Sequence, residues 1–211
     1  MISLPLDIWT SDDEPRLGVV LDEIWTLLEE GVTDRRHGFH TPVAATMRAS
    51  SGAELRTVVL RDVDREARCL RFHTDIRSKK VCDLKEDPRL SLLFYDRGAQ
   101  TQIRISAAAI INHNDGTAAQ AWKKLSPDCR REYLASEQPG EPSAWPTSGL
   151  SPDLQDRDLT LAETEKGYRD FAVVSASFDH LEWLYACHEG HRRAKFEWLA
   201  NGELETTWLV P

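Results

Sequence analysis

The chain has 211 residues and a formal net charge of −9, from 35 acidic and 26 basic side chains. Hydrophobic residues make up 41% and charged residues 29%, which excludes a wholly disordered chain. The length suits one domain. The acidic balance excludes nucleic acid and acidic membrane surfaces as general partners, but a local basic pocket can still hold a small anion.

The first half of the chain predicts a long helix followed by strands. Apolar residues recur at spacings of three and four over residues 15–31, and Gly31 is the expected stop. Alternating and β-branched segments then follow, separated by turn residues. The predicted strands cover residues 42–49, 54–63, 67–73, 90–95 and 101–112, and a short helix covers residues 78–86.

The second half predicts two helices, a long loop and four more strands. The helices cover residues 115–125 and a short stretch from 126, and prolines and glycines then favour a loop up to about residue 160–165. Long loops in compact domains often cover a functional site. The remaining strands cover residues 171–176, 181–187, 194–200 and 205–210, with a hairpin signal at Asn201-Gly202.

This order of elements predicts a mainly β (α+β) fold. Strands that neighbour in sequence favour an antiparallel barrel with helices packed outside, rather than a βαβ sheet. We expect one domain over residues 1–211, with the long loop at about 136–165.

Cysteine usage and the absence of a leader predict the compartment. The cysteines show no CxxC or zinc-type spacing, so we expect reduced thiols and no metal site. They are Cys69, Cys82, Cys129 and Cys187. No apolar run reaches the length of a membrane span, and no basic-then-apolar leader is present. We therefore expect a soluble, cytoplasmic protein.

Basic and hydroxyl side chains gather within 25 residues in the first half of the chain. Arg56 lies on a predicted strand, Thr74 follows the next strand, and Ser78, Lys79 and Lys80 open a predicted helix. Cations, hydroxyls and a helix N-terminus together are how proteins hold a phosphate monoester. Each residue alone could be solvated surface, but the ensemble predicts a phosphate site.

Three motifs in this region resemble the pyridoxamine 5′-phosphate oxidase family. They are R-T-V-V-L-R at 56–61, F-H-T-D-I-R-S-K-K at 72–80 and D-P-R-L-S-L-L-F-Y at 87–95, and their spacing matches the family without gaps. A weaker similarity follows in D-H-L-E-W at 179–183 and H-R-R-A-K-F at 191–196.

The resemblance implies an antiparallel FMN-binding split β-barrel with peripheral helices. It also implies a homodimer with FMN in clefts at the subunit interface. Arg56 and Lys80 would contact the phosphate, Arg61 is one candidate for the cation beside the flavin, and Trp183 or Leu184 takes an aromatic position of the family. The expected cofactor-binding residues are Arg56, Thr57, Val58, Val59, Leu60, Arg61, His73, Thr74, Ser78, Lys79, Lys80, Gln102, Gln138, Trp183 and Lys195.

The substrate half of the family pattern is rewritten in this chain. The first strand ends in Arg61 where the family has Lys, and, counted back from Gln138, the family's Tyr, Arg and Ser positions fall near Ala121, Leu125 and Cys129. The chain thus resembles the oxidase-related subgroup more closely than the true oxidase. We expect an FMN-dependent oxidoreductase with an altered substrate site, and no residue is assigned as catalytic acid or base.

Two other functions remain open at this point. One is a non-catalytic FMN carrier or sensor with the same fold. The other is a haem-binding split barrel, which would use an exposed histidine such as His73 or His188.

Overall fold

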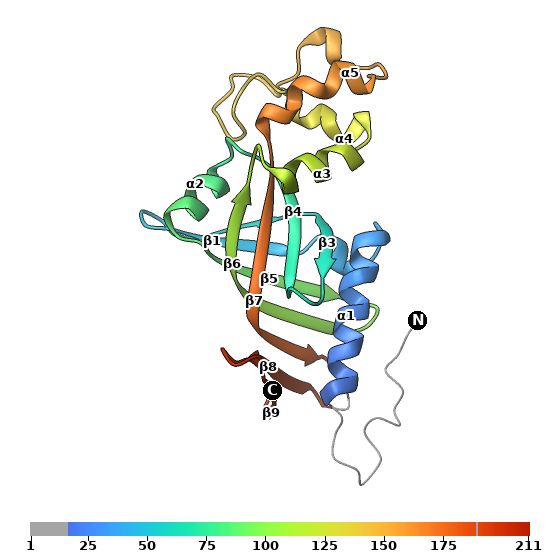
Figure 1. Ribbon diagram of the computed structural model, residues 1–211, viewed down its shortest axis with the longest axis vertical. Helices are drawn as coiled ribbons and strands as arrows, with labels where there is room; N and C mark the ends of the chain where they lie inside the picture. The colour runs from blue at the N-terminus through green and yellow to red at the C-terminus, as the bar shows by residue number, and fades with distance from the viewer. Residues whose placement is uncertain (1–16, 189) are drawn as a thin grey trace.

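The computed structural model describes residues 17–188 and 190–211, and its strands form one nine-stranded antiparallel sheet (Figure 1). The strands are β1 (Val43–Arg48), β2 (Gly52–Thr57), β3 (Leu60–Asp64), β4 (Cys69–Asp75), β5 (Arg89–Asp96), β6 (Thr101–Asn112), β7 (Phe171–Tyr185), β8 (Arg192–Trp198) and β9 (Leu204–Leu209). The α-helices are α1 (Leu17–Thr33), α2 (Lys79–Glu86), α3 (Gly116–Lys124), α4 (Pro127–Arg131) and α5 (Leu161–Thr164). Short 3₁₀ turns are η2 (Gly38–His40), η3 (Glu132–Leu134), η4 (Pro152–Leu154) and η5 (Glu165–Asp170).

The strands follow the order β2-β1-β5-β6-β7-β4-β3, and β8 and β9 continue the sheet from β7. The long strand β7 pairs with β4 over its first half and with β8 over its second half. Opposite β6, its register shifts between Ser106 and Ala107, which leaves Asp179 as an extra residue. Such a bulge bends a strand and strengthens its twist. The bend lets one strand serve two parts of the sheet.

Most predicted elements are confirmed, and two strand predictions are wrong. The predicted strand over 54–63 is two strands, because β2 pairs with β1 whereas β3 pairs with β4. The backbone changes partner at residues 58–59, where the Val58 N–H donates to the Pro42 carbonyl (2.9 Å). The predicted strands over 171–176 and 181–187 are the single strand β7, since β6 pairs with both halves across the bulge.

Helix α1 also corrects an expectation about its end. The first two residues of the predicted helix lie outside the described residues, and the helix continues past Gly31 to Thr33. A Cβ at Gly31 would lie 2.9 Å from the Phe39 backbone carbon. Gly31 therefore permits close packing of η2 against α1 and does not stop the helix.

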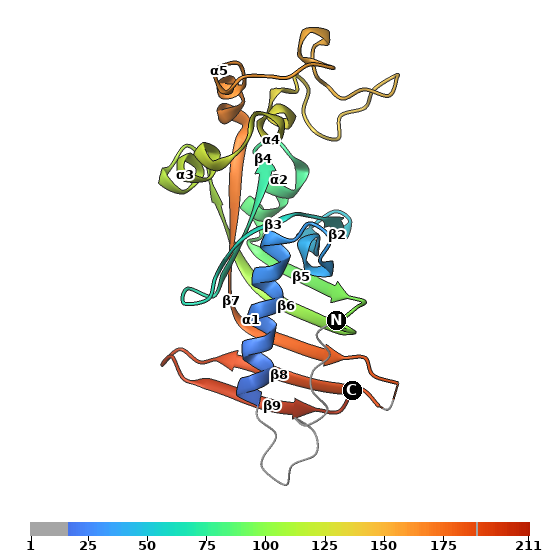
Figure 2. The same cartoon turned by 90° about the vertical axis from the view of Figure 1, so that its right-hand side faces the viewer.

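The main core lies between α1 and one face of the sheet (Figure 2). Ile24 and Leu28 of α1 are fully buried with Phe94, Trp183 and Phe196 of the strands. A smaller cluster packs α3 and η3 on the first residues of β7, through Trp122, Tyr133 and Phe171. In both views the helices α3–α5 lie at one end of the molecule and β8–β9 at the other (Figures 1 and 2).

The opposite face of the sheet is called the outer face here. Strand alternation and register place on it Leu55, Met47, Leu93, Tyr95, Gln102, Arg104, His180, Glu182, Leu184, Arg193 and Lys195. Several are large apolar side chains that are 39–66% exposed. Among the described residues, no helix is long and apolar enough to cross a membrane.

Candidate functional site

The predicted phosphate-binding residues meet at the start of α2. Thr74 lies on the buried face of β4. Ser78 is the N-cap residue of α2, and its side chain makes no capping hydrogen bond. Their hydroxyl oxygens are 3.1 Å apart. The Lys80 ammonium donates to Thr74 Oγ1 (2.9 Å) and Ser78 Oγ (3.3 Å). Two buried hydroxyls and an amine thus converge beside the N–H groups of a helix N-terminus. We call Thr74, Ser78 and Lys80 the phosphate-binding cluster.

Positive charge gathers at these residues, from Lys80 and from the nearby Arg56. Burial, and then the nearby Arg56 guanidinium, lower the pKa of Lys80. Among the described residues, Lys80 forms no ion pair with a carboxylate. Two partly buried cations that repel each other are the arrangement that a dianion would stabilise. The residues present therefore fit a phosphate monoester.

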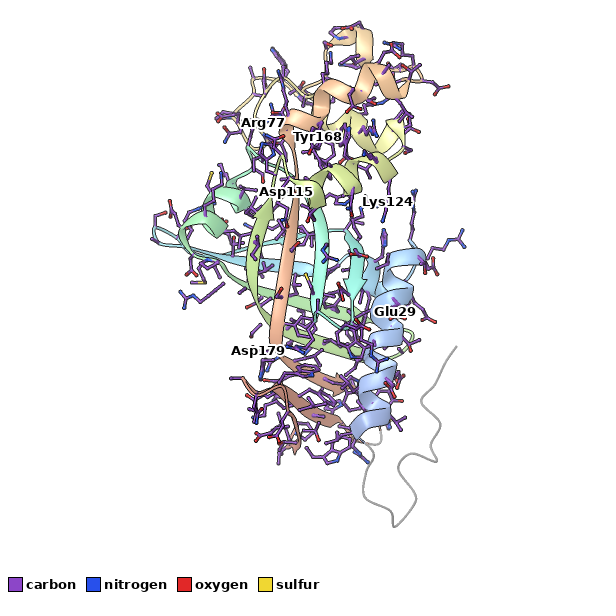
Figure 3. All side chains as sticks on the ribbon, viewed as in Figure 1. Glu29, Arg77, Asp115, Lys124, Tyr168 and Asp179 are labelled. Carbon is purple, nitrogen blue, oxygen red and sulfur yellow. The ribbon has the colours of Figure 1, made fainter. Side chains whose placement is uncertain are left out.

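The long loop approaches the same place from the other side. A Cβ at Gly140 would lie 3.7 Å from the Lys79 side chain, so the loop passes beside the first residue of α2. Arg77 links the two segments, donating to the Ala135 carbonyl (3.1 Å) and to the Asp75 carboxylate (2.6 Å) (Figure 3). Gln138 lies exposed at the base of this loop. The loop residue Gly140 thereby lies beside Lys79, and the role of Gln138 stays a prediction.

Arg61 and His73 lie on the other side of β4 and line a separate cavity. The cavity has a volume of about 360 Å³ and lies between β3, β4 and α3. Its remaining wall comes from Asp62, Arg71, Thr117, Gln120, Ala121, Lys124, Leu125 and Val173. Figure 3 shows Lys124 at the end of α3. We call this space the Arg61 pocket.

The Arg61 pocket contains a guanidinium cation and a neutral imidazole. The Nε atom of Arg61 is buried and makes no hydrogen bond to any described residue. Burial, followed by the charge of Arg61, lowers the pKa of His73 to about 4. The His73 ring packs edge-on against Phe171 at 5.0 Å. The pocket therefore offers an anion-binding guanidinium beside an uncharged hydrogen-bonding ring.

A second group of predicted residues lies on the outer face. Gln102 pairs with Leu184, and Leu184 pairs with Arg193, so these side chains share one face. Lys195 lies one step along β8 and forms an ion pair with Glu197 at 2.5 Å. Trp183 points to the opposite face and is fully buried in the core. Leu184, not Trp183, is the residue beside Gln102.

Glu182 organises the cations of this second group. It accepts hydrogen bonds from Arg104 and from Arg193, whose Nε lies at 3.1 Å. Burial raises the pKa of Glu182, but these two arginines overcome it and hold the value at about 2. The carboxylate is therefore ionised at neutral pH and fixes both guanidinium groups.

The remaining predicted residues form the link between β2 and β3. Thr57 is exposed at the end of β2, whereas Val58 and Leu60 are buried. The backbone between them turns from one strand partner to another. That turn places Arg56 on the phosphate side and Arg61 on the pocket side.

Sequence reasoning missed the residues that support Arg56. Its Nη1 donates to Thr46 Oγ1 (2.7 Å), and Thr46 Oγ1 donates to the buried carboxylate of Asp83 (2.9 Å). The signal for Asp83 was its position one helical turn after Lys79 and Lys80. Thr46 gave no signal, because only the pairing of β1 with β2 brings it beside Arg56.

A match to a family model decides what this arrangement is. Residues 23–113 match the model of the pyridoxamine 5′-phosphate oxidase FMN-binding domain. These residues are similar to that FMN-binding domain. The matched region contains the phosphate-binding cluster, Arg61, His73 and Gln102. FMN is its cofactor, and the dianion site at α2 fits the FMN phosphate.

Known proteins extend the similarity beyond the FMN-binding domain. A pyridoxine/pyridoxamine 5′-phosphate oxidase from Psychrobacter cryohalolentis is 24% identical over 180 residues, which cover 79% of this chain and 77% of the relative. A pyridoxamine 5′-phosphate oxidase-related FMN-binding protein from Nostoc punctiforme superposes with a TM-score of 0.69 at 18% identity, covering 95% of this chain and 100% of that one. PhzG from Burkholderia lata, solved with tetrahydrophenazine-1-carboxylic acid, also gives 0.69 at 22% identity, covering 100% and 98%. The chain has the FMN-binding split β-barrel fold.

Proposed function

We propose that this protein is an FMN-dependent oxidoreductase. Bound FMN supplies hydride transfer, and the protein supplies position and electrostatics. The observation that carries the proposal is the Arg61 pocket, a cavity separate from the phosphate-binding cluster, in which the buried Nε of Arg61 makes no hydrogen bond to a described residue. A carrier or sensor needs only the cofactor site, whereas an enzyme also needs room for a second ligand. The pocket therefore favours the enzyme over the carrier, and FMN as cofactor disfavours the haem alternative.

The substrate is a small anionic molecule other than pyridoxamine phosphate. Ala121 and Leu125, near which the Tyr and Arg positions of the family fall, both line the Arg61 pocket. The pocket thus has two apolar side chains where the family pattern offers polar groups for a phosphate. Arg71 and Asp62 of the wall form an ion pair with each other, which leaves Arg61 and Lys124 as cations beside a His73 that is uncharged at neutral pH. One carboxylate on the substrate matches this reduced set of donors.

The functional unit is a homodimer with FMN between the subunits. The phosphate-binding cluster lies at the start of α2, toward the helical end of the molecule (Figure 1). Gln102, Leu184 and Lys195 lie toward β8, at the other end. One cofactor reaches both groups when a second copy supplies one of them. The exposed apolar residues of the outer face support this arrangement, since such patches mark interaction surfaces.

The described thiols support a cytoplasmic location for this enzyme. Cys69, Cys82, Cys129 and Cys187 are all free. Unpaired cysteines are typical of proteins in reducing compartments.

Purified protein and three variants test this proposal. Arg56→Ala and Lys80→Ala each remove a charge-assisted contact, so we expect the FMN content to fall by about 10-fold or more. Arg61→Ala should keep its FMN but lose turnover, measured as flavin reduction by reduced nicotinamides or by a panel of carboxylated reductants and reoxidation under oxygen. Unchanged FMN content in both phosphate variants would overturn the site. Equal activity of Arg61→Ala and the wild type would overturn the substrate pocket.

A further inference from the structure

A buried carboxylate lies on the same helix as Lys80 of the phosphate-binding cluster. Asp83 of α2 is 4% exposed and follows Lys80 by less than one helical turn. A negative charge there opposes the binding of an anion. The residues around Asp83 show how the fold removes this conflict.

Arg48 occupies both oxygens of the Asp83 carboxylate. Its Nε lies 3.0 Å from Oδ1 and its Nη2 lies 3.3 Å from Oδ2. Its third nitrogen, Nη1, binds Glu54 Oε1 at 3.0 Å. Burial raises the pKa of Asp83, but hydrogen bonds from Arg48 and Thr46 outweigh it and lower the value. The carboxylate is therefore ionised and saturated by Arg48.

Arg56 stands beside this pair without being captured by it. The distance from its Nη2 to Asp83 Oδ2 is 3.7 Å, too long for a hydrogen bond. Its Nη1 instead donates to the hydroxyl of Thr46 at 2.7 Å. That hydroxyl has a single hydrogen, which it donates to Asp83, so its lone pairs face Arg56. Neutral oxygen atoms thus accept the hydrogen bonds of this guanidinium, and its ion pair with Asp83 stays long, at 3.7 Å.

We propose that Arg48 is a positioning residue for the cofactor: it neutralises Asp83 and thereby keeps Arg56 available for the FMN phosphate. This inference rests on the proposed phosphate site. Without Arg48, the nearest cation to Asp83 is Arg56. A carboxylate and a guanidinium at this distance form a two-point ion pair when nothing competes. Arg56 would then turn toward Asp83 and away from the phosphate.

Substitutions of Arg48 and Asp83 should therefore have opposite effects on the affinity for FMN. Arg48→Met alone leaves Asp83 to capture Arg56, and FMN binding weakens. Adding Asp83→Asn removes the competing charge and returns Arg56 to the phosphate. The double variant also has the same net charge at the site as the wild type. Because the two residues are in contact, a purely structural role would also give non-additive losses, but it would weaken FMN and riboflavin binding alike.

The test compares FMN with riboflavin, which lacks the phosphate. Dissociation constants come from quenching of flavin fluorescence on the apoprotein, for the wild type, Arg48→Met, Asp83→Asn and the double variant. We expect Arg48→Met to weaken FMN binding about 10-fold and riboflavin binding less than about 2-fold. The double variant should return to within about 3-fold of the wild type for FMN. Arg65→Met, which breaks a distant pair with Asp22, is the control and should change neither constant.

Additive losses in the double variant, or parallel losses of FMN and riboflavin, overturn the role of Arg48. If Arg48→Met does not fold, Arg48→Lys replaces it: one ammonium can serve only one Asp83 oxygen, so a smaller loss, again rescued by Asp83→Asn, is expected. Absence of that loss overturns the proposal. A wild type that binds riboflavin as tightly as FMN overturns the phosphate site itself.

Discussion

Replacing Glu182 by Gln should destabilise the protein in a pH-dependent way. The carboxylate binds two arginines on the outer face, and its pKa is held at about 2 against 4.5 for an ordinary glutamate. This difference corresponds to at most about 3.4 kcal/mol of stability at neutral pH. Because the Arg104 side chain is 52% exposed, water screens part of it, and we expect a loss of about 1.5–2.5 kcal/mol.

The sign of the pH dependence follows from the depressed pKa. The stabilisation is complete above pH 4.5, the value in the unfolded chain, and is lost as the pH falls toward 2. The assay is thermal unfolding of the FMN-saturated protein at fixed protein concentration. Glu182→Gln should lower the Tm by about 3–10 °C at pH 7, and this deficit should narrow between pH 5 and pH 3.

A matched control distinguishes this network from an ordinary surface pair. Glu163 also has a pKa of about 2, lowered first by the Thr160 backbone N–H and then by Arg157, but its side chain is 39% exposed against 17% for Glu182. Glu163→Gln should therefore cost less stability than Glu182→Gln. A Glu182→Gln deficit that is absent at pH 7, or constant down to pH 3, would refute the reasoning.

Three further perturbations test other parts of the structure. His73→Phe keeps the ring contact with Phe171 but removes a histidine whose pKa is about 4. Below pH 6.5 the unfolded wild-type chain binds a proton at His73, whereas the folded protein does not. The wild type should therefore lose stability relative to the variant between pH 6.5 and 4 in urea titrations. Gly38→Ala places a Cβ 2.7 Å from backbone atoms of β5 and should cost about 1–3 kcal/mol in the same titrations, whereas an unchanged midpoint would contradict the packing. Leu55→Asp, on a side chain 66% exposed on the outer face, should dissociate the proposed dimer in analytical ultracentrifugation, whereas Leu161→Asp on α5 should not.

The local order of elements was predictable because each signal lies within a few residues. Alternation predicted β5 and β6, and the capping residues predicted α3 and α4 close to their observed bounds. The strand boundaries at 58–59 and across Asp179 were not predictable. In both places the change is one of pairing partner, and a pairing partner is distant in sequence.

The sequence by itself determined the chemistry of the cofactor site. Arg56, Thr74, Ser78 and Lys80 occur at a spacing that predicts a phosphate site, and the structure brings the last three within hydrogen-bonding distance. Residues of one short β-strand and the helix after it stay close in any compact fold, so local spacing carries this information.

Only the tertiary structure decided which residues support that chemistry and which face they use. Burial and strand pairing assigned Leu184 to the outer face and Trp183 to the core, a choice of one residue that reverses the direction of a side chain. They also placed Arg48, Thr46 and Asp83 around Arg56. These contacts join β1, β2 and α2 across as many as 37 residues of sequence, so no local pattern could reveal them.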